Sequence, residues 1–169
     1  MTPEQLKDLY ARRASAMARR PIFARGSGQA RVRLGPDLLC DVEHPGHSMV
    51  ADAPPDAGGY GLGPDPGELM AASLGSSLAM GYRLWSARLD LPLRGAEVDV
   101  QCEYDLRGQL GAGDAPVGWQ RLIVAVTVTS PAPEAAVRQM VERADRHCPM
   151  LANLSPEIER LHRLTIVRG

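Results

Sequence analysis

Residues 65–82, with the sequence DPGELMAASLGSSLAMGY, decide how this chain folds. Asp65, Pro66 and Glu68 form a capping-box pattern, in which the side chains at the start of a helix bond its free backbone N–H groups. The pattern predicts a helix over residues 66–88. The fourteen residues after Glu68 carry no charge, and small side chains occupy every face of the helix. Because a helix that is apolar all round is a buried one, we expect it to lie at the centre of the fold, enclosed by a sheet or by another subunit.

Alternation of apolar and polar residues predicts strands on both sides of this helix. The turn Pro45-Gly46 separates two of them, and it suits a type II turn because proline fixes φ and glycine accepts a positive φ. The unbroken alternation of the later strands favours an antiparallel pair with one face in the core. The expected strands before the helix are residues 30–34, 38–43 and 47–52, and those after it are 96–107 and 119–129.

The remaining segments complete an α+β pattern. Helices are expected at residues 4–20 and 134–147, with a helical turn from Pro149 and a last strand at 161–167. Three strands, a helix, two strands, a helix and a strand follow one another, which favours α+β over a doubly wound parallel sheet. Residues 52–66 are too rich in proline and glycine for regular structure, and a loop of this length is more often functional than accidental.

Length and composition indicate one globular domain that needs neither disulfides nor a structural metal. The chain has 169 residues, 44% of them hydrophobic, and a net charge of −1. A chain of this length buries roughly 70% of the surface that it exposes when unfolded. The charge balance argues against a dedicated nucleic-acid binder, and no apolar run is long enough to span a bilayer. The first residues lack the pattern of a signal peptide, so we expect a cytoplasmic protein with neither nucleic acid nor membrane as its partner.

Positive charge is concentrated near the start of the chain. Residues 1–33 hold eight basic and two acidic side chains, so the rest of the chain carries a net charge of −7. We expect a basic N-terminal helix or arm over residues 1–27, followed by one α+β domain over 28–169. Such an arm docks on nucleic acid, on an anionic membrane or on an acidic partner subunit, or it is simply a solvated face.

Cys148 is the candidate reactive thiol among three cysteines. Pro149 suits the first position of a helical turn, which places Cys148 at the N-cap, where unpaired N–H groups favour a thiolate. An inert, half-buried cysteine at a helix junction is the alternative. Cys40 and Cys102 fall on the apolar faces of their predicted strands and are expected to be small core residues. The odd number of cysteines argues against a disulfide framework.

Two other motifs have plainer explanations. His44 and His47 are spaced like metal ligands, but a turn accounts for them and no third ligand is near in sequence, so we expect no metal. The segment Gly75-Ser-Ser-Leu-Ala79 imitates the nucleophile elbow of serine hydrolases. That motif works only at a sharp turn from strand to helix, whereas Ser77 lies inside the predicted helix. No cofactor motif is present, and no cofactor is expected.

Two stretches of the chain resemble the OsmC/Ohr family of osmotically inducible and organic-hydroperoxide-resistance proteins. The first runs from Gly58-Gly59 through Gly63-Pro-Asp-Pro-Gly-Glu-Leu69 to the small-residue helix ending at Met80. The second is Ala144-Asp-Arg-His-Cys-Pro149, followed by Asn153, which is similar to the family's C-terminal Cys-Pro site. Together with the order of elements, the resemblance covers roughly residues 28–168.

The resemblance implies an α+β homodimer with antiparallel sheets wrapped around a buried central helix, the two chains being intertwined. It also implies a thiol peroxidase. In the family, a cysteine on the central helix attacks the hydroperoxide and becomes a sulfenic acid, and the Cys-Pro cysteine then closes a disulfide that a dithiol reopens. A glutamate near the start of the helix and an arginine from the preceding loop hold the attacking thiolate in place and activate it.

This sequence matches that site only in part. Cys148 corresponds to the resolving cysteine and Glu68 to the glutamate at the start of the helix. Ser77 occupies the position of the attacking cysteine, and the loop 52–66 contains no arginine. A serine hydroxyl is not ionised at neutral pH and forms no sulfenic acid, so the two-cysteine cycle cannot run. The candidate catalytic residues are therefore Cys148, Ser77 and Glu68.

Three functions follow from this departure. The first is a protein of the oxidative-stress family that has lost the peroxidase cycle and keeps a small-molecule pocket between two subunits. The second is a one-cysteine peroxidase in which Cys148 is oxidised and an external thiol or dithiol reduces it. The third is a non-enzymatic interaction protein that docks through its basic N-terminal arm. Whether the protein is an enzyme depends on which of the three holds.

Overall fold

The computed structural model describes residues 1–169, which form two compact units. One unit consists of residues 1–10 and 71–169, and the other of residues 11–70. Two helices, α1 (Pro3–Arg19) and α2 (Pro66–Arg88), begin in one unit and end in the other. The expected division of the chain between residues 27 and 28 stays a prediction.

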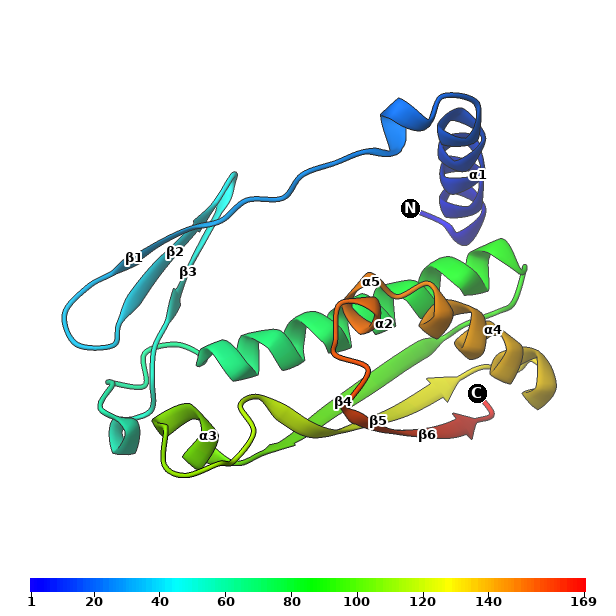
Figure 1. Ribbon diagram of the computed structural model, residues 1–169. Helices are drawn as coiled ribbons and strands as arrows, with labels where there is room; N and C mark the ends of the chain where they lie inside the picture. The colour runs from blue at the N-terminus through cyan, green and yellow to red at the C-terminus, as the bar shows by residue number, and fades with distance from the viewer. The chain divides into compact units, whose positions relative to one another are not determined.

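The larger unit contains a three-stranded sheet in the order β4-β5-β6. Strands β4 (Gly95–Tyr104) and β5 (Trp119–Thr129) are antiparallel, as the alternation predicts. Strand β6 (Glu159–Val167) is parallel to β5, so this sheet is mixed, and the expected α+β fold class is confirmed with one parallel pair in it. Helices α4 (Glu134–Arg146) and α5 (Pro149–Ala152) carry the chain back across the sheet before β6 begins (Figure 1), and such a crossover is what a parallel pair requires.

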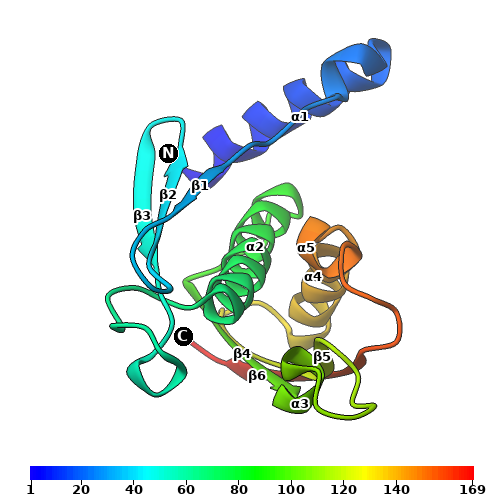
Figure 2. The same cartoon turned by 60° about the vertical axis from the view of Figure 1, so that its left-hand side comes forward.

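The core of this unit lies between one face of the sheet and the helices α2 and α4 (Figures 1 and 2). Leu74, Leu78 and Tyr82 form the buried stripe of α2. The small residues of α2 permit close packing, since a Cβ at Gly75 would lie 3.4 Å from the Val100 side chain. Other positions of α2 face outward, and Met80 is 71% exposed. The helix is therefore buried along one side within a single chain, not all round.

The smaller unit contains an antiparallel sheet in the order β1-β2-β3. Its strands are β1 (Arg31–Leu34), β2 (Cys40–His44) and β3 (His47–Ala51). Gly46, in the turn between β2 and β3, has a φ of 86°, which confirms the expected need for glycine there. One row across the sheet joins Val32, Val42 and Met49, and Val32 and Met49 are exposed to solvent.

The long loop after β3 is ordered by one buried carboxylate. Asp52 is 1% exposed, and its Oδ2 atom accepts the backbone N–H groups of Tyr60 and Leu62 at 3.0 and 3.1 Å. Gly59 passes so close to the backbone that a Cβ there would lie 2.0 Å from the Ala53 carbonyl oxygen. The loop includes the short helix η2 (Pro55–Ala57).

Three short features complete the description. A 3₁₀ turn, η1 (Pro21–Ala24), follows α1 and ends that helix at the expected proline. The strand predicted to reach residue 107 stops at Tyr104, because Asp105 caps a short helix, α3 (Leu106–Leu110), through the N–H of Arg107. None of the helices combines the length and the apolar character that crossing a membrane would require.

Candidate functional site

Ser77 and Cys148 meet in the larger unit, although they are 71 residues apart in sequence. The Oγ atom of Ser77 lies 3.4 Å from the Sγ atom of Cys148, a contact in which either group can be the donor. Ser77 is half-buried on the middle of α2, and Cys148 is 5% exposed within the core. The fold therefore brings together the two residues that the sequence singled out.

The position of Cys148 is fixed by the junction between α4 and α5. Its backbone N–H donates to the Asp145 carbonyl at 3.1 Å, and its own carbonyl accepts the N–H of Ala152 at 3.1 Å. Cys148 is the N-cap of α5 and Pro149 the first residue of that helix, as predicted. The thiol makes no capping hydrogen bond, so it is available to Ser77.

A second contact between a hydroxyl and a sulfur lies one turn away. Ser73, four residues before Ser77 on α2, donates from Oγ to the Sδ atom of Met150 at 3.3 Å. Residues four apart on a helix are neighbours, so the two hydroxyls lie side by side. Small polar side chains on successive turns of α2 therefore face the two sulfur atoms of the Cys148–Met150 segment.

Glu68 is engaged at the first turn of α2. Its carboxylate accepts the backbone N–H of Asp65 at 2.9 Å, while Asp65 accepts the N–H of Glu68 at 2.8 Å. This reciprocal pair is the capping box that the sequence predicts. Glu68 lies nine residues before Ser77 on the same helix. Its suggested part in activating a thiolate stays a prediction.

A cluster beside Cys148 was not foreseen from the sequence. Tyr82, which is fully buried, donates from its hydroxyl to Oδ1 of Asp145 at 2.8 Å. The other carboxylate oxygen, Oδ2, lies 3.4 Å from Nε2 of His162 on β6. One signal was present: Tyr82 is the only aromatic residue in the small-residue stretch, and Asp145 precedes Cys148 by three positions.

Burial shifts the titration of two of these groups. Burial raises the pKa of Asp145 above its usual value, although the hydrogen bond from Tyr82 and the nearby His162 act in the opposite direction. Burial also raises the pKa of Tyr82, and the neighbouring Asp145 carboxylate adds to that effect. Tyr82 therefore stays a neutral hydrogen-bond donor at physiological pH.

His147 precedes Cys148 but faces a different neighbour. Its Nδ1 atom lies 2.7 Å from the Arg143 carbonyl oxygen, and its ring is tilted against Trp85 with centroids 4.8 Å apart. The guanidinium of Arg88 lies over the same indole at 4.4 Å. The hydrogen bond and the ring contact fix the orientation of the imidazole beside the Cys-Pro corner.

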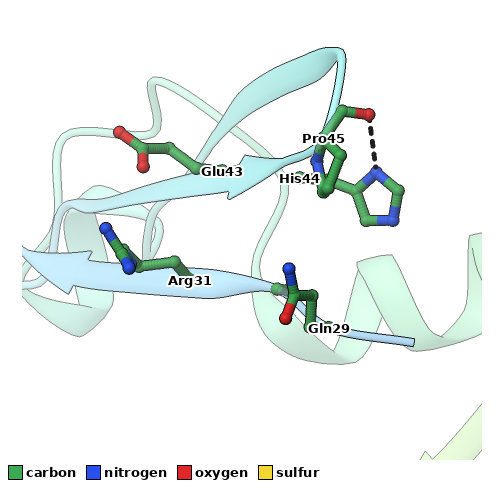
Figure 3. A pocket seen from close by; sticks show the side chains of 6 residues that line it. Gln29, Arg31, Glu43, His44 and Pro45 are labelled. Atoms are coloured by element: carbon green, nitrogen blue, oxygen red, sulfur yellow. Dashed lines mark hydrogen bonds between the residues drawn. The ribbon is translucent and has the colours of Figure 1, made fainter. Parts of the chain in front are cut away.

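The other residues considered from the sequence lie elsewhere. Cys40 and Cys102 are half-buried, not fully enclosed as expected of core residues. The rings of His44 and His47 are 6.4 Å apart across the β2–β3 turn, and no three potential metal ligands gather anywhere in the chain. A hollow where β1 begins and β2 ends contains neither Ser77 nor Cys148 (Figure 3); its lining residues are Gln29, Ala30, Arg31, Glu43, His44 and Pro45.

Comparison with known proteins identifies relatives of this arrangement. A model of the OsmC-like protein family matches residues 58–160, more than half of the chain. An OsmC-like protein from Mycoplasma pneumoniae superposes with a TM-score of 0.73 at 14% identity, covering 84% of this chain and 98% of its own. The organic hydroperoxide resistance protein OsmC from Legionella pneumophila gives 0.60 at 15% identity, with 84% and 97% covered.

A third similar structure contains a bound small molecule. It is a Vibrio cholerae protein assigned to organic hydroperoxide resistance, with captopril in one of its active sites. Its TM-score is 0.61 at 16% identity, and the match covers 83% of this chain and 93% of that one. Identities this low show a shared fold only. No curated protein matches the sequence.

Proposed function

Because this chain belongs to the OsmC-like protein family, we propose that it is a cytoplasmic member that has lost the two-cysteine peroxidase cycle and keeps the site for binding a small molecule. The observation that carries the proposal is the 3.4 Å contact between Ser77 and Cys148. The Ser77 hydroxyl and the Cys148 thiol are in contact, as two side chains that react with each other would have to be. One of them, however, is an alcohol, which neither ionises at neutral pH nor forms a disulfide.

The pocket in this proposal lies between two copies of the chain. Each unit, taken by itself, leaves apolar side chains in solvent: Met70 of the smaller unit is 47% exposed, and Met80 of the larger is 71% exposed. The sheet of the smaller unit also exposes Val32, Leu34 and Met49. Clustered apolar exposure marks interaction sites. A homodimer would cover these residues, and a second chain would then help to enclose the small side chains of α2.

Two measurements test this proposal. Size-exclusion chromatography with light scattering is expected to give the mass of a dimer. An assay with cumene hydroperoxide and dithiothreitol is expected to show no more peroxide loss than the Cys148→Ser variant shows. A monomer would contradict the shared pocket, and turnover that depends on Cys148 would contradict the loss of peroxidase activity.

A one-cysteine peroxidase is the second candidate, and the same contact favours it. A hydroxyl 3.4 Å from Cys148 Sγ can donate a hydrogen bond to a thiolate, and such bonds stabilise the charged form. Low exposure protects a sulfenic acid from further oxidation, and Cys148 is 5% exposed.

The reaction of this second candidate needs only Cys148 and external thiols. The thiolate attacks the terminal oxygen of the hydroperoxide, the O–O bond breaks, and the alkoxide leaves as an alcohol after taking a proton. Cys148 becomes a sulfenic acid. A first external thiol condenses with it to give a mixed disulfide and water, and a second thiol releases the Cys148 thiol and an external disulfide.

Mass spectrometry distinguishes the two candidates. The wild type is treated with one equivalent of cumene hydroperoxide, and Cys148 is then trapped with dimedone. A dimedone adduct at Cys148, removed by prior incubation with dithiothreitol, supports the one-cysteine reaction. An unmodified Cys148, in a protein whose Cys40 and Cys102 are also unmodified, supports the non-peroxidase proposal.

A further inference from the structure

The four serines of α2 fall into two pairs that differ in what their hydroxyl groups bond. The hydroxyls of Ser76 and Ser86 donate to carbonyl oxygens three residues earlier in the same helix, at 3.1 and 2.8 Å. Such bonds are common for a serine inside a helix. The hydroxyls of Ser73 and Ser77 instead contact the two sulfur atoms of the Cys148–Met150 segment. Sulfur is a weaker acceptor than a carbonyl oxygen, so helix formation alone does not account for these two contacts.

Met150 is the less buried of the two sulfur residues in this segment. It is half-buried against the core, on α5 beside α2 (Figures 1 and 2), whereas Cys148 is 5% exposed. Ser73, which donates from Oγ to the Sδ atom of Met150 at 3.3 Å, is exposed. A thioether sulfur has two lone pairs, so one of them stays available when the other accepts this hydrogen bond. A small molecule that reaches Ser73 therefore meets a sulfur whose position is fixed by the core and by a hydroxyl.

We propose that Met150 is a modification site: a hydroperoxide oxidises its thioether to the sulfoxide, and Ser73 is the hydrogen-bond donor that assists this step. The available lone pair of Sδ attacks the terminal oxygen of the hydroperoxide, the S–O bond forms and the O–O bond breaks. The proton of that oxygen passes to the departing alkoxide, which leaves as an alcohol. Sulfur has then lost two electrons, and the hydroperoxide has gained them. This inference rests on the proposed function only in that a small molecule reaches the site beside α2.

The contribution of Ser73 follows from where charge develops. In the transition state the sulfur becomes partly positive and the transferred oxygen partly negative. The Ser73 hydroxyl already lies beside the atom to which that oxygen becomes attached, and it can turn from the sulfur to the oxygen. A donor held where negative charge develops lowers the barrier without the reorganisation that bulk water needs. The product is a polar side chain two residues from the buried Cys148 thiol.

Exposure alone predicts a different order of reactivity among the methionines. Met80, on the same helix as Ser73, is 71% exposed, and Met140 is fully buried. If access to solvent decided the rate, Met80 would be oxidised first, Met150 later and Met140 last. The proposal places Met150 first, because its sulfur has a hydroxyl in place, whereas the water around Met80 must reorient during the reaction.

Peptide mass spectrometry during treatment with cumene hydroperoxide tests the inference. The Cys148→Ser variant is treated beside the wild type, so that oxidation of Met150 is also measured without the neighbouring thiol. In both proteins Met150 is expected to gain one oxygen atom faster than Met80. Ser73→Ala is expected to slow the gain at Met150 by roughly 2- to 10-fold, the effect of one hydrogen bond, and to leave the rate at Met80 unchanged.

Ser76→Ala is the matched control, because it removes an exposed hydroxyl of the same helix that donates to the Ser73 carbonyl and not to a sulfur. This variant is expected to leave the rate at Met150 unchanged. Ser73→Thr keeps a hydroxyl and is expected to retain most of the wild-type rate. In concentrated urea, where the fold is lost, Met150 and Met80 are expected to react at the same rate.

Two results would overturn the inference. One is a Met150 that is oxidised no faster than Met80 in the folded wild type, and the other is a folded Ser73→Ala protein in which Met150 reacts as fast as before. If Ser73→Ala does not fold, the comparison of Met150 with Met80 decides. The experiment contains no reductant and follows one oxygen atom at Met150. Its failure is thus separate from failure of the proposed function, which is measured as peroxide turnover that depends on Cys148.

Discussion

The Ser77 hydroxyl and the Cys148 sulfur lie 3.4 Å apart, on two elements of the larger unit, although the two residues are separated by 71 positions in the sequence. The helix supplies Ser77 from a surface of small residues, and the Cys-Pro junction supplies the thiol. Replacing the oxygen with sulfur would bring two cysteines within reach of a disulfide. The chemistry of this pair thus depends on one atom.

The Ser77→Cys variant is expected to consume organic hydroperoxide with a dithiol as reductant. A thiol at this position can ionise, accept the peroxide oxygen and form a disulfide with Cys148. We expect peroxide consumption at least about tenfold above the wild type, which corresponds to a barrier lowered by about 1.4 kcal/mol. Two readouts measure this: the loss of cumene hydroperoxide, and an intact mass that is lower by two hydrogen atoms after oxidation.

Ser76→Cys is the control for that experiment. Ser76 is the neighbouring residue on α2, but it is exposed and its hydroxyl bonds the Ser73 carbonyl of its own helix at 3.1 Å. A cysteine there is expected to give no disulfide with Cys148. Equal gains in both variants would show that any added thiol suffices. No gain in a folded Ser77→Cys protein would show that the absent loop arginine or a reshaped pocket also matters.

The stability of the protein is expected to fall as the pH rises through the range in which Asp145 loses its proton. Burial raises the pKa of Asp145, so the folded state retains this proton at pH values where the unfolded chain, with a pKa near 3.8, has released it. The stabilisation is therefore complete below that value and is lost as pH rises through the raised pKa. Asp145→Asn does not titrate at this position, so its free energy of unfolding, taken relative to that of the wild type, is expected to increase over this range.

Urea unfolding at a series of pH values from about 3.5 to 7 measures this difference. Other carboxylates change the absolute curve; the Arg107 side chain, for example, lowers the pKa of Asp105. They do so equally in both proteins, so only the difference reports Asp145. A difference that stays constant with pH would contradict the assignment.

The start of α2 is expected to be sensitive to loss of its cap. Asp65→Ala removes the acceptor that bonds the Glu68 N–H at 2.8 Å, and a lost N-cap costs about 0.5–2 kcal/mol. Glu68→Gln keeps an oxygen that can accept the Asp65 N–H, so its cost should be smaller. The midpoint of urea unfolding at constant slope measures both. An equal loss in the two variants would show that the charge of Glu68, not the capping geometry, matters.

Local patterns in the sequence predicted most of the elements, and the resemblance to the OsmC/Ohr family implied that Ser77 and Cys148 would meet. The capping box fixed the start of α2, and the Cys-Pro sequence fixed the junction before α5. What escaped prediction depends on contacts between distant segments. The parallel register of β6 follows from how the crossover helices pack, and the turn of helix after Tyr104 follows from a single Asp105 cap.

The cluster of Tyr82, Asp145 and His162 could not be predicted from the sequence for the same reason. Its members are separated by 63 residues at one contact and join three elements, so no spacing in the sequence reveals them. The exposed side of α2 shows a limit on what composition can predict about burial. Composition predicted a helix buried all round, but composition does not say whether its own chain or a second chain covers each face.

The basic N-terminal segment provides the last prediction. Residues 11–33 contain seven arginines and no acidic residue, whereas residues 34–169 carry a net charge of −7. If the arm docks on the acidic body of a second copy, deleting residues 1–27 should weaken the dimer in low salt and remove most of the dependence of its dissociation on salt. Sedimentation velocity at about 0.05 and 0.5 M NaCl measures this, because the higher salt screens charges beyond a few ångströms.

Two variants of the full chain separate charge from apolar contact in this arm. Ile22 and Phe23 are 65% and 60% exposed, and the Arg20 guanidinium lies 5.9 Å from the Phe23 ring. Replacing Arg19, Arg20 and Arg25 with glutamine should reduce the salt dependence, since each removed charge weakens the electrostatic attraction. Replacing Ile22 and Phe23 with serine should leave it unchanged. A salt dependence that survives deletion of the arm would show that the arginines are a solvated face and that the dimer forms without them.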